Sequence, residues 1–330
     1  MCSVSRRDAA TRYTIGGGRM SEDINRGWSA DTYGERHGFE GDWRDDWWNA
    51  DFLDLMARRW RLDAVTCALD VGCGVGHWGQ LLAPRCAPGV ELHGLDHEGG
   101  FRIPAEERAA RRELTFTFHE ATGDALPFAD ASFDLVTCQT VLMHVPDPVA
   151  VLAEMRRVVR PGGLVVASEP NNLANALVES LAAPRLPFEE TLELLRFQES
   201  LHRGKIALGR GDNSVGERLP ARFAEAGLVE LAVVSNDRCP ALVPPYVDAA
   251  QKRDIAQQLR FLDEAASGWG AKEDVRELHR AAGGTPAAFD RGWASLAAHH
   301  ERFREAVAAG TYAGARGITQ YLVSGRRGPR

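Results

Sequence analysis

The sequence predicts an α/β protein whose core is a doubly wound, mostly parallel sheet of seven strands, with an N-terminal helical cap and C-terminal helical insertions. Between residues 65 and 170, short apolar runs alternate with helical patterns. A glycine cluster follows the first apolar run, and two more strand-like runs come later in the chain. This alternation indicates right-handed crossovers and a sheet covered by helices on both faces.

Five strands and four helices are expected in the first half, and the first helix is an amphipathic one over about residues 48–60. The expected strands are residues 65–71, 90–95, 114–118, 133–138 and 164–168. A helix should begin at Gly76 and stop at Pro84, and a charged helix should span 103–112. Asp147-Pro148 is a typical helix start, and Pro161-Gly162-Gly163 should end that helix.

The second half should complete the sheet around helical insertions. We expect helical structure over 171–210, 219–226 and most of 240–312, with strands at 228–234 and 318–324. The chain is therefore divided into a loose arm and helical cap (1–64), a Rossmann-like core (65–170) and the remaining strands with their insertions (171–330).

Composition excludes several classes of protein. The 330 residues are 44% hydrophobic and 26% charged, with a formal net charge of −7, so no broad cationic field suggests nucleic acid as a partner. No apolar run reaches the roughly 18 residues of a membrane span, and we expect no secretory signal because residues 1–20 contain no long apolar stretch. Its six cysteines form no CxxC pair, so we expect a cytoplasmic protein without a bound metal.

The stretch ALDVGCGVGHWGQLLA, residues 68–83, resembles a nucleotide-binding loop. Its glycines give G-x-G-x-G, whereas a dinucleotide fingerprint needs a third glycine where His77 stands. Asp70 ends the strand, and its carboxylate would repel a pyrophosphate by about 1 kcal/mol even in water. The ammonium of S-adenosylmethionine would instead be attracted, and loop N–H groups can bind its carboxylate.

Two more acidic residues follow neighbouring strands. Asp96 ends the second strand, where it can accept hydrogen bonds from both ribose hydroxyls of either NAD or S-adenosylmethionine. Asp124, in TGDALPF, can accept from an adenine amino group, and the N–H of Ala125 can face the ring.

From about residue 66 to 170 the chain resembles the class I S-adenosylmethionine-dependent methyltransferases, in the group that includes ubiquinone-biosynthesis and small-molecule enzymes. The matching pieces are LDVGCGVGHW, LHGLD, GDALPF, FDLVTCQTVLMHVPDP and EMRRVVRPGGLVVASEPN. The resemblance implies S-adenosylmethionine as cofactor and S-adenosylhomocysteine as product. It also implies a small-molecule acceptor, whose binding site would be formed by the insertions after 170. It implies a cofactor site made of Tyr33, Asp70, Gly72, Cys73, Gly74, Gly76, Trp78, Asp96, His97, Asp124, Ala125 and Gln139.

Two residues are candidates for chemistry. Methyl transfer is an in-line displacement that needs mainly alignment, and a base only if the acceptor must lose a proton early. His144 can be that base, or a histidine that fixes its loop through the backbone. Glu169 can bind the acceptor or orient His144, or it belongs to a polar edge that caps the helix after Pro170.

Acceptor contacts are expected from several segments. The candidates are Arg36, His37, Asn171, Asn172 and Arg203. Lys205, Arg210 and Asp212 can also bind an acceptor, although Asp212 or Ser214 can equally cap the following helix. The tryptophans at 43, 47 and 48 either stack on a ligand or, more in keeping with such clusters, pack against the fold.

Several alternatives stay open. The methylated atom can be oxygen, nitrogen or carbon, and a peptide acceptor is not excluded. A nicotinamide-dependent oxidoreductase would need glycine at 77, and a non-catalytic cofactor-binding protein would bind without turnover. Gln139-Thr140-Val141-Leu142 stands where a nucleic-acid methyltransferase would carry an Asn/Asp-Pro-Pro-Tyr element. The helical segments outside the core can form the interface of a homodimer.

Overall fold

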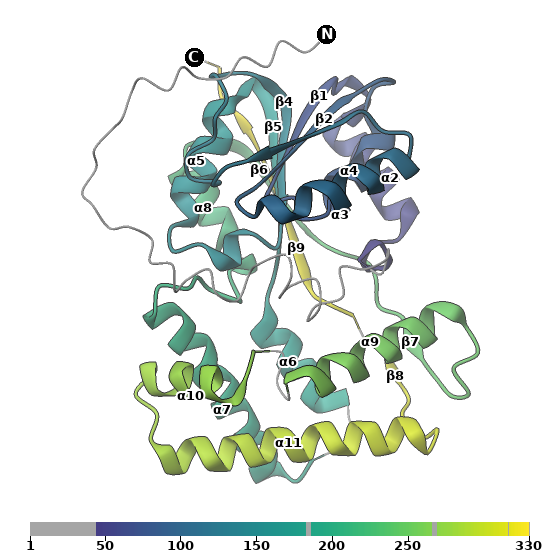
Figure 1. Cartoon of the computed structure of the whole chain (residues 1–330), viewed down its shortest axis with the longest axis vertical. Coiled ribbons are helices and arrows are strands. Elements are labelled where there is room, and N and C mark those ends of the chain that lie inside the picture. Colours follow the sequence, from purple (N-terminus) through teal and green to yellow (C-terminus); the bar gives the residue numbers. More distant parts are fainter. Residues whose placement is uncertain (1–43, 183–185, 266–268, 316, 330) are drawn as a thin grey trace.

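The computed structural model describes residues 44–182, 186–265, 269–315 and 317–329, and a seven-stranded sheet forms its core (Figure 1). The strand order is β3-β2-β1-β4-β5-β9-β6. The strands are β1 (Cys67–Val71), β2 (Glu91–Asp96), β3 (Phe116–Glu120), β4 (Phe133–Gln139), β5 (Val159–Pro170), β6 (Leu228–Ser235) and β9 (Gln320–Arg327). Strands β1 to β5 are parallel, and β9 runs antiparallel between β5 and β6. The predicted fold class is confirmed.

Helices cover both faces of this sheet. They are α2 (Ala50–Trp60), α3 (His77–Leu82), α4 (Arg102–Arg111), α5 (Pro148–Val158) and α8 (Leu219–Glu225). Along β1 the side chains alternate between two buried clusters. Ala68 joins a cluster with residues of α2 and α3, whereas Leu69 joins one with residues of α5 and α8. This two-faced burial is what a parallel sheet with crossover helices requires.

The helical insertions form the lower part of the molecule in Figure 1. They are α6 (Asn172–Ala182), α7 (Phe188–Ala207), α9 (Ala249–Ala265), α10 (Lys272–Ala281) and α11 (Pro286–Ala308). Two short strands, β7 (Ala241–Leu242) and β8 (Gly314–Ala315), pair outside the main sheet and were not predicted. Separate apolar clusters hold α7 against α10 and α11, and α9 against α11.

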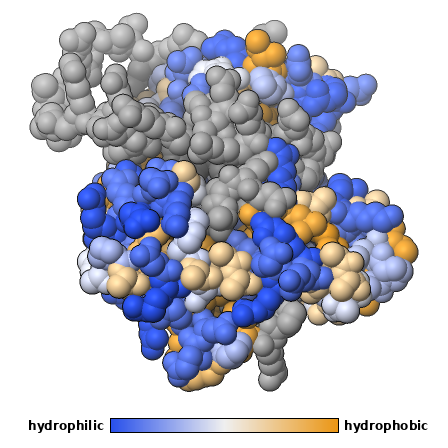
Figure 2. All heavy atoms as spheres, turned by 60° about the horizontal axis from the view of Figure 1, so that its bottom comes forward, coloured by the Kyte–Doolittle hydropathy of each residue, from blue (hydrophilic) through white to orange (hydrophobic). Residues whose placement is uncertain are grey.

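The surface of the insertions is mostly hydrophilic. Figure 2 shows the lower end of the molecule turned forward, with apolar residues gathered only in small patches among polar ones. Among the described residues, every helix is too short or too polar to cross a membrane.

Several predicted boundaries need correction. The first strand starts at Cys67, the third at Phe116 and the last at Gln320, each two residues later than expected. Helix α5 ends at Val158, and β5 already includes Pro161-Gly162-Gly163. The pairing explains this, because Phe133 of β4 faces Val159 while Leu135 faces Leu164, so the extra residues form an irregularity within the strand. Gly162 supplies the left-handed conformation there, with φ of 76°.

Candidate functional site

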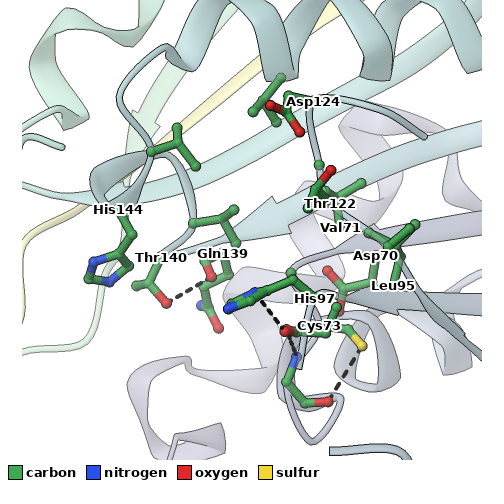
Figure 3. Close-up of a pocket in the computed structure, with 18 of the residues that line it drawn as sticks. Asp70, Val71, Cys73, Leu95, His97, Thr122, Asp124, Gln139, Thr140 and His144 are labelled. Carbon is green, nitrogen blue, oxygen red and sulfur yellow. Dashed lines mark hydrogen bonds and ion pairs between the residues drawn. The ribbon is translucent and has the colours of Figure 1, made fainter. Parts of the chain in front are cut away.

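A cavity of about 560 Å³ opens at the carboxyl ends of β1, β2 and β4, where doubly wound folds bind their ligands (Figure 3). Ten of the predicted site residues line it: Asp70, Gly72, Cys73, Gly74, Trp78, Asp96, His97, Asp124, Gln139 and His144. The sequence therefore located this cavity. Predicted residues outside its lining are Gly76, Ala125, Glu169, Asn171, Asn172 and Arg203. Tyr33, Arg36 and His37 lie outside the described residues.

The glycine loop turns tightly between β1 and α3. Gly72 has φ of 66°, and a Cβ at this position would lie 2.4 Å from Cγ2 of Val141. A side chain here would therefore clash with the loop after β4, so glycine is required. The N–H groups of Cys73, Gly74 and Gly76 are already bonded, to Leu95, Asp96 and Cys73 oxygens. These three N–H groups would have to exchange a partner within the chain to bind a ligand carboxylate, so that contact stays a prediction.

Asp70 is buried at the end of β1 beneath this loop. Its Oδ2 accepts a hydrogen bond of 2.8 Å from the N–H of Gly79, and a Cβ on Gly79 would lie 2.8 Å from the same oxygen. Its Oδ1 has no hydrogen-bond partner among the described residues. Burial raises the pKa of Asp70 to about 7. A buried carboxylate oxygen without a partner fits a cationic ligand group, such as the ammonium of an amino-acid tail.

Asp96 ties the second strand to the glycine loop. Its Oδ2 accepts from the N–H of Gly74 at 2.9 Å, and its Oδ1 accepts from the N–H of Glu98 at 3.1 Å. The ring Nδ1 of His97 lies 3.2 Å from Oδ1, and this hydrogen bond raises the pKa of His97. Each carboxylate oxygen can accept two bonds, so Oδ1 is fully used and Oδ2 keeps room for one more donor, such as one ribose hydroxyl.

The adenine side is only partly as predicted. Asp124 lines the cavity, but the N–H of Ala125 donates to the Thr122 carbonyl at 3.3 Å. Gln139 was expected to contribute its backbone. Its side-chain Nε2 is buried without a hydrogen-bond partner among the described residues, so it offers the cavity a donor as well.

Aromatic packing shapes the wall beside the loop. The rings of Trp48 and Trp78 lie 5.0 Å apart, and the Trp78 indole N–H donates to the Thr137 hydroxyl at 2.6 Å. The packing interpretation of the tryptophan cluster thus holds for Trp48, whereas Trp43 lies outside the described residues. Arg44 also lines the cavity, stacked over Trp47 at 5.2 Å. The sequence analysis missed Arg44, because nothing local distinguishes it from a surface arginine.

Glu169 is completely buried and holds the turn that carries His144. Its Oε1 accepts from the N–H groups of Val141 and Leu142, both at 2.8 Å, and its Oε2 accepts from Met143 at 3.2 Å. These bonds cap the 3₁₀ turn η5 (Leu142–His144). Burial still raises the pKa of Glu169 to about 7. Glu169 is therefore a positioning residue outside the cavity lining, and the predicted cap on the helix after Pro170 is supplied by Asn171 of the same polar edge.

The predicted acceptor residues around α6 and α7 have structural roles. Asn171 caps α6, because its Oδ1 accepts from the N–H of Ala174 at 2.9 Å. Asn172 Oδ1 accepts from the Asn175 amide at 3.2 Å. Arg203 is exposed and pairs with Glu199 at 2.6 Å. These three predictions are corrected, since their side chains point to partners outside the cavity.

Arg210 is the residue of the insertions that reaches the cavity lining. Its guanidinium pairs with Glu277 at 2.9 Å. The adjoining Gly211 has φ of 88°, and a Cβ there would lie 2.4 Å from the Met143 carbonyl oxygen. This close approach presses the loop onto the His144 turn, so Arg210 and His144 belong to one end of the cavity. In the sequence, the glycines at 209 and 211 on either side of Arg210 were the feature that could have indicated this close approach.

The chain is similar to several known methyltransferases. Residues 69–167 match a family model described as a methyltransferase domain. Over 173 residues, 52% of this chain and 70% of the relative, the sequence is 34% identical to a demethylmenaquinone methyltransferase of Staphylococcus aureus. A solved putative sarcosine dimethylglycine methyltransferase from Galdieria sulphuraria is similar with a TM-score of 0.46 and 19% identity over 86% of each chain. For phosphoethanolamine N-methyltransferase 2 of Haemonchus contortus the values are 0.49 and 14%, over 95% of this chain and 61% of that one.

Proposed function

The chain belongs to the class I S-adenosylmethionine-dependent methyltransferases, and from this premise we propose that it methylates an oxygen, nitrogen or carbon nucleophile of a small-molecule acceptor by in-line displacement. The main support is Asp70, whose partnerless buried oxygen lies in the cavity at the glycine loop. A dinucleotide would bring a pyrophosphate to this loop, where the Asp70 charge opposes it and three N–H groups are already bonded.

The cavity residues fit the parts of this cofactor. Asp70 Oδ1 would take the ammonium, and Arg44, which also lines the cavity, would take the carboxylate. Asp96 Oδ2 would accept from one ribose hydroxyl, and Asp124 from the adenine amino group. When bound, S-adenosylmethionine supplies a methyl group activated by its sulfonium.

The acceptor would enter beside His144. Figure 3 shows His144 and Thr140 on the opposite side of Gln139 from Asp70 and Cys73. Because the donor is already activated, the protein contributes mainly alignment and the exclusion of water. The turn that carries His144 is suited to alignment, since Glu169 fixes three of its backbone N–H groups.

The demethylmenaquinone methyltransferase shares the cofactor region but need not share the acceptor. In this chain the acceptor end includes Arg210, which comes from the loop after α7. A cationic side chain at that end favours a polar or anionic acceptor over a purely apolar one. We therefore propose a small polar molecule as the acceptor.

Calorimetric titration with S-adenosylmethionine, S-adenosylhomocysteine and NAD⁺ tests the cofactor, after removal of any co-purified ligand. We expect micromolar binding of both adenosyl compounds and none of NAD⁺. Binding of NAD⁺ alone would overturn the proposal. A screen of small polar acceptors with methyl-labelled donor then tests turnover, and cofactor binding without any labelled product would favour a non-catalytic cofactor-binding protein.

A further inference from the structure

We propose that the side-chain amide of Gln139 selects ligands that carry a carboxylate, because its Nε2 donates a hydrogen bond to the carboxylate of the cofactor's amino-acid tail. The inference rests on the proposed function for the identity of that ligand. The observation behind it is a buried amide donor in the cavity wall with no hydrogen-bond partner among the described residues.

Gln139 ends β4 and lines the cavity, and only 8% of its surface is exposed. Its backbone carbonyl accepts from the Thr140 hydroxyl at 2.7 Å, so the unused hydrogen-bonding group is in the side chain. A buried donor left unpaired costs about 1–3 kcal/mol. The Nε2 group therefore favours a ligand atom that accepts a hydrogen bond.

Asp70 carries the complementary atom, because its Oδ1 is a buried acceptor with no partner in the described part of the chain. Strands β1 and β4 are parallel neighbours, and Asp70 pairs with Thr137. The Asp70 side chain faces α3, where it accepts from the N–H of Gly79. The Thr137 hydroxyl faces the same helix, where it accepts from the indole N–H of Trp78. Gln139 follows Thr137 by two residues and shares that face, so its side chain enters the cavity from the strand next to Asp70 (Figure 3).

An acceptor and a donor on adjacent strand ends match an amino-acid group, whose ammonium and carboxylate are joined through one carbon. The strand order β2-β1-β4 puts Gln139 on the side of Asp70 away from Asp96, which is assigned to the ribose in the proposed function. The tail carboxylate lies beyond the ammonium as seen from the ribose, so it is the group that Gln139 would meet. Three N–H groups of the glycine loop are already bonded within the chain, whereas the amide donor is unused.

An amide suits this position because it donates without adding charge. Asp70 and Asp96 already place two carboxylates at the cofactor end, and a third acidic side chain there would repel the tail carboxylate. The two oxygens of a carboxylate can accept from Gln139 and from Arg44 together. A ligand without this group would leave Nε2 buried and unpaired, which is how the amide discriminates against it.

Three adenosyl thioethers test the inference by calorimetry, because they differ only in the tail. S-adenosylhomocysteine carries both tail charges, its decarboxylated analogue keeps only the ammonium, and methylthioadenosine has neither. Gln139→Met keeps the length of the side chain but has no donor. We expect it to weaken S-adenosylhomocysteine binding by about tenfold or more, the scale of one hydrogen bond to a charged group. The affinity for the other two compounds should stay at the wild-type value.

Two further variants sharpen this test. Gln139→Glu replaces the donor by a carboxylate, so it should weaken S-adenosylhomocysteine binding more than Gln139→Met does. Stronger binding would mean that the amide oxygen faces the ammonium, and would overturn the inference. Gln198→Met is the matched control, because the Gln198 amide lies outside the cavity lining and accepts from Trp269 at 3.1 Å. It should leave all three affinities unchanged.

Thermal unfolding without ligand separates recognition from a structural role. Because Nε2 has no partner to lose among the described residues, Gln139→Met should keep the wild-type unfolding midpoint. A lowered midpoint, no loss of affinity, or an equal loss for all three compounds would overturn the inference alone. Wild-type protein that binds none of the three compounds would overturn the proposed function, and the inference with it.

Discussion

The two ends of the cavity are built in different ways. The cofactor end is formed by residues that follow directly on β1 and β2 or end these strands. Asp70 and Gly72, for example, are only two positions apart. The acceptor end joins distant segments, since Lys205 contacts Met143 across 62 residues of sequence. The cofactor end leaves Asp70 Oδ1 without a partner among the described residues, whereas Glu169 and Lys205 are bonded within the chain. The cofactor end therefore leaves a polar atom available to a ligand, whereas the polar groups at the acceptor end are buried and hydrogen-bonded within the chain.

The largest effect on stability should come from removing one of these buried polar groups. Glu169→Ala should lower the free energy of unfolding by about 3–5 kcal/mol, because the N–H groups of Val141, Leu142 and Met143 lose their buried acceptor. Urea unfolding followed by circular dichroism measures this. Glu225→Ala, which removes an exposed pair with Arg222, is the control and should cost less than about 0.5 kcal/mol. Equal losses in the two variants would contradict the positioning role.

At the cofactor end, Asp96→Ala should weaken S-adenosylhomocysteine binding by about 1–3 kcal/mol, the scale of lost charge-assisted hydrogen bonds. The same change frees the N–H of Gly74, so the glycine loop also loses a tether. Calorimetry measures the affinity, with Asp54→Ala as the control because Asp54 pairs with Arg85 at the surface. An unchanged dissociation constant would remove Asp96 from the ribose site.

A smaller effect should appear in the pH dependence of cofactor binding. Burial raises the pKa of Asp70 to about 7, so the native protein holds this proton over a range in which the unfolded chain has lost it. Asp70 thus makes native stability fall as pH rises from its unfolded value toward about 7. Binding of an ammonium favours the ionised form, so affinity for S-adenosylmethionine should rise roughly fivefold from pH 6 to pH 7.

Asp70→Asn is the control for that pH dependence. Asparagine keeps an oxygen for the Gly79 N–H but cannot ionise. Calorimetry between pH 5.5 and 7.5 should therefore show weaker binding with little pH dependence. If the variant keeps the wild-type slope, another group is responsible and the assignment of Asp70 to the ammonium fails.

The smallest effect is expected at Arg203, which the sequence analysis placed in the acceptor site. Its exposed pair with Glu199 should contribute less than about 0.5 kcal/mol to stability. In a methyl-transfer assay with any acceptor found by screening, Arg203→Ala should keep wild-type kcat and KM, whereas Arg210→Ala should raise KM. A raised KM for Arg203→Ala would return this residue to the acceptor site.

The sequence by itself determined the fold class and placed most of the residues of the proposed cofactor end. Strands and helices alternate with strong periodicity, and the carboxyl ends of parallel strands meet at one edge. Asp70, Asp96 and Asp124 could therefore be assigned to one site from their positions in the chain. Local chemistry was enough there, because each residue follows its own strand directly.

Only the tertiary structure decided the acceptor end. Nothing near Glu169 in sequence shows that its carboxylate turns inward to the N–H groups of residues 141–143, and nothing near Lys205 shows that its ammonium reaches His144. Arg203 and Lys205 are two residues apart on one helix, yet one faces solvent and the other the core. Which charge is buried depends on the packing of α7 against the sheet domain, and long-range packing of this kind is not encoded in any local pattern.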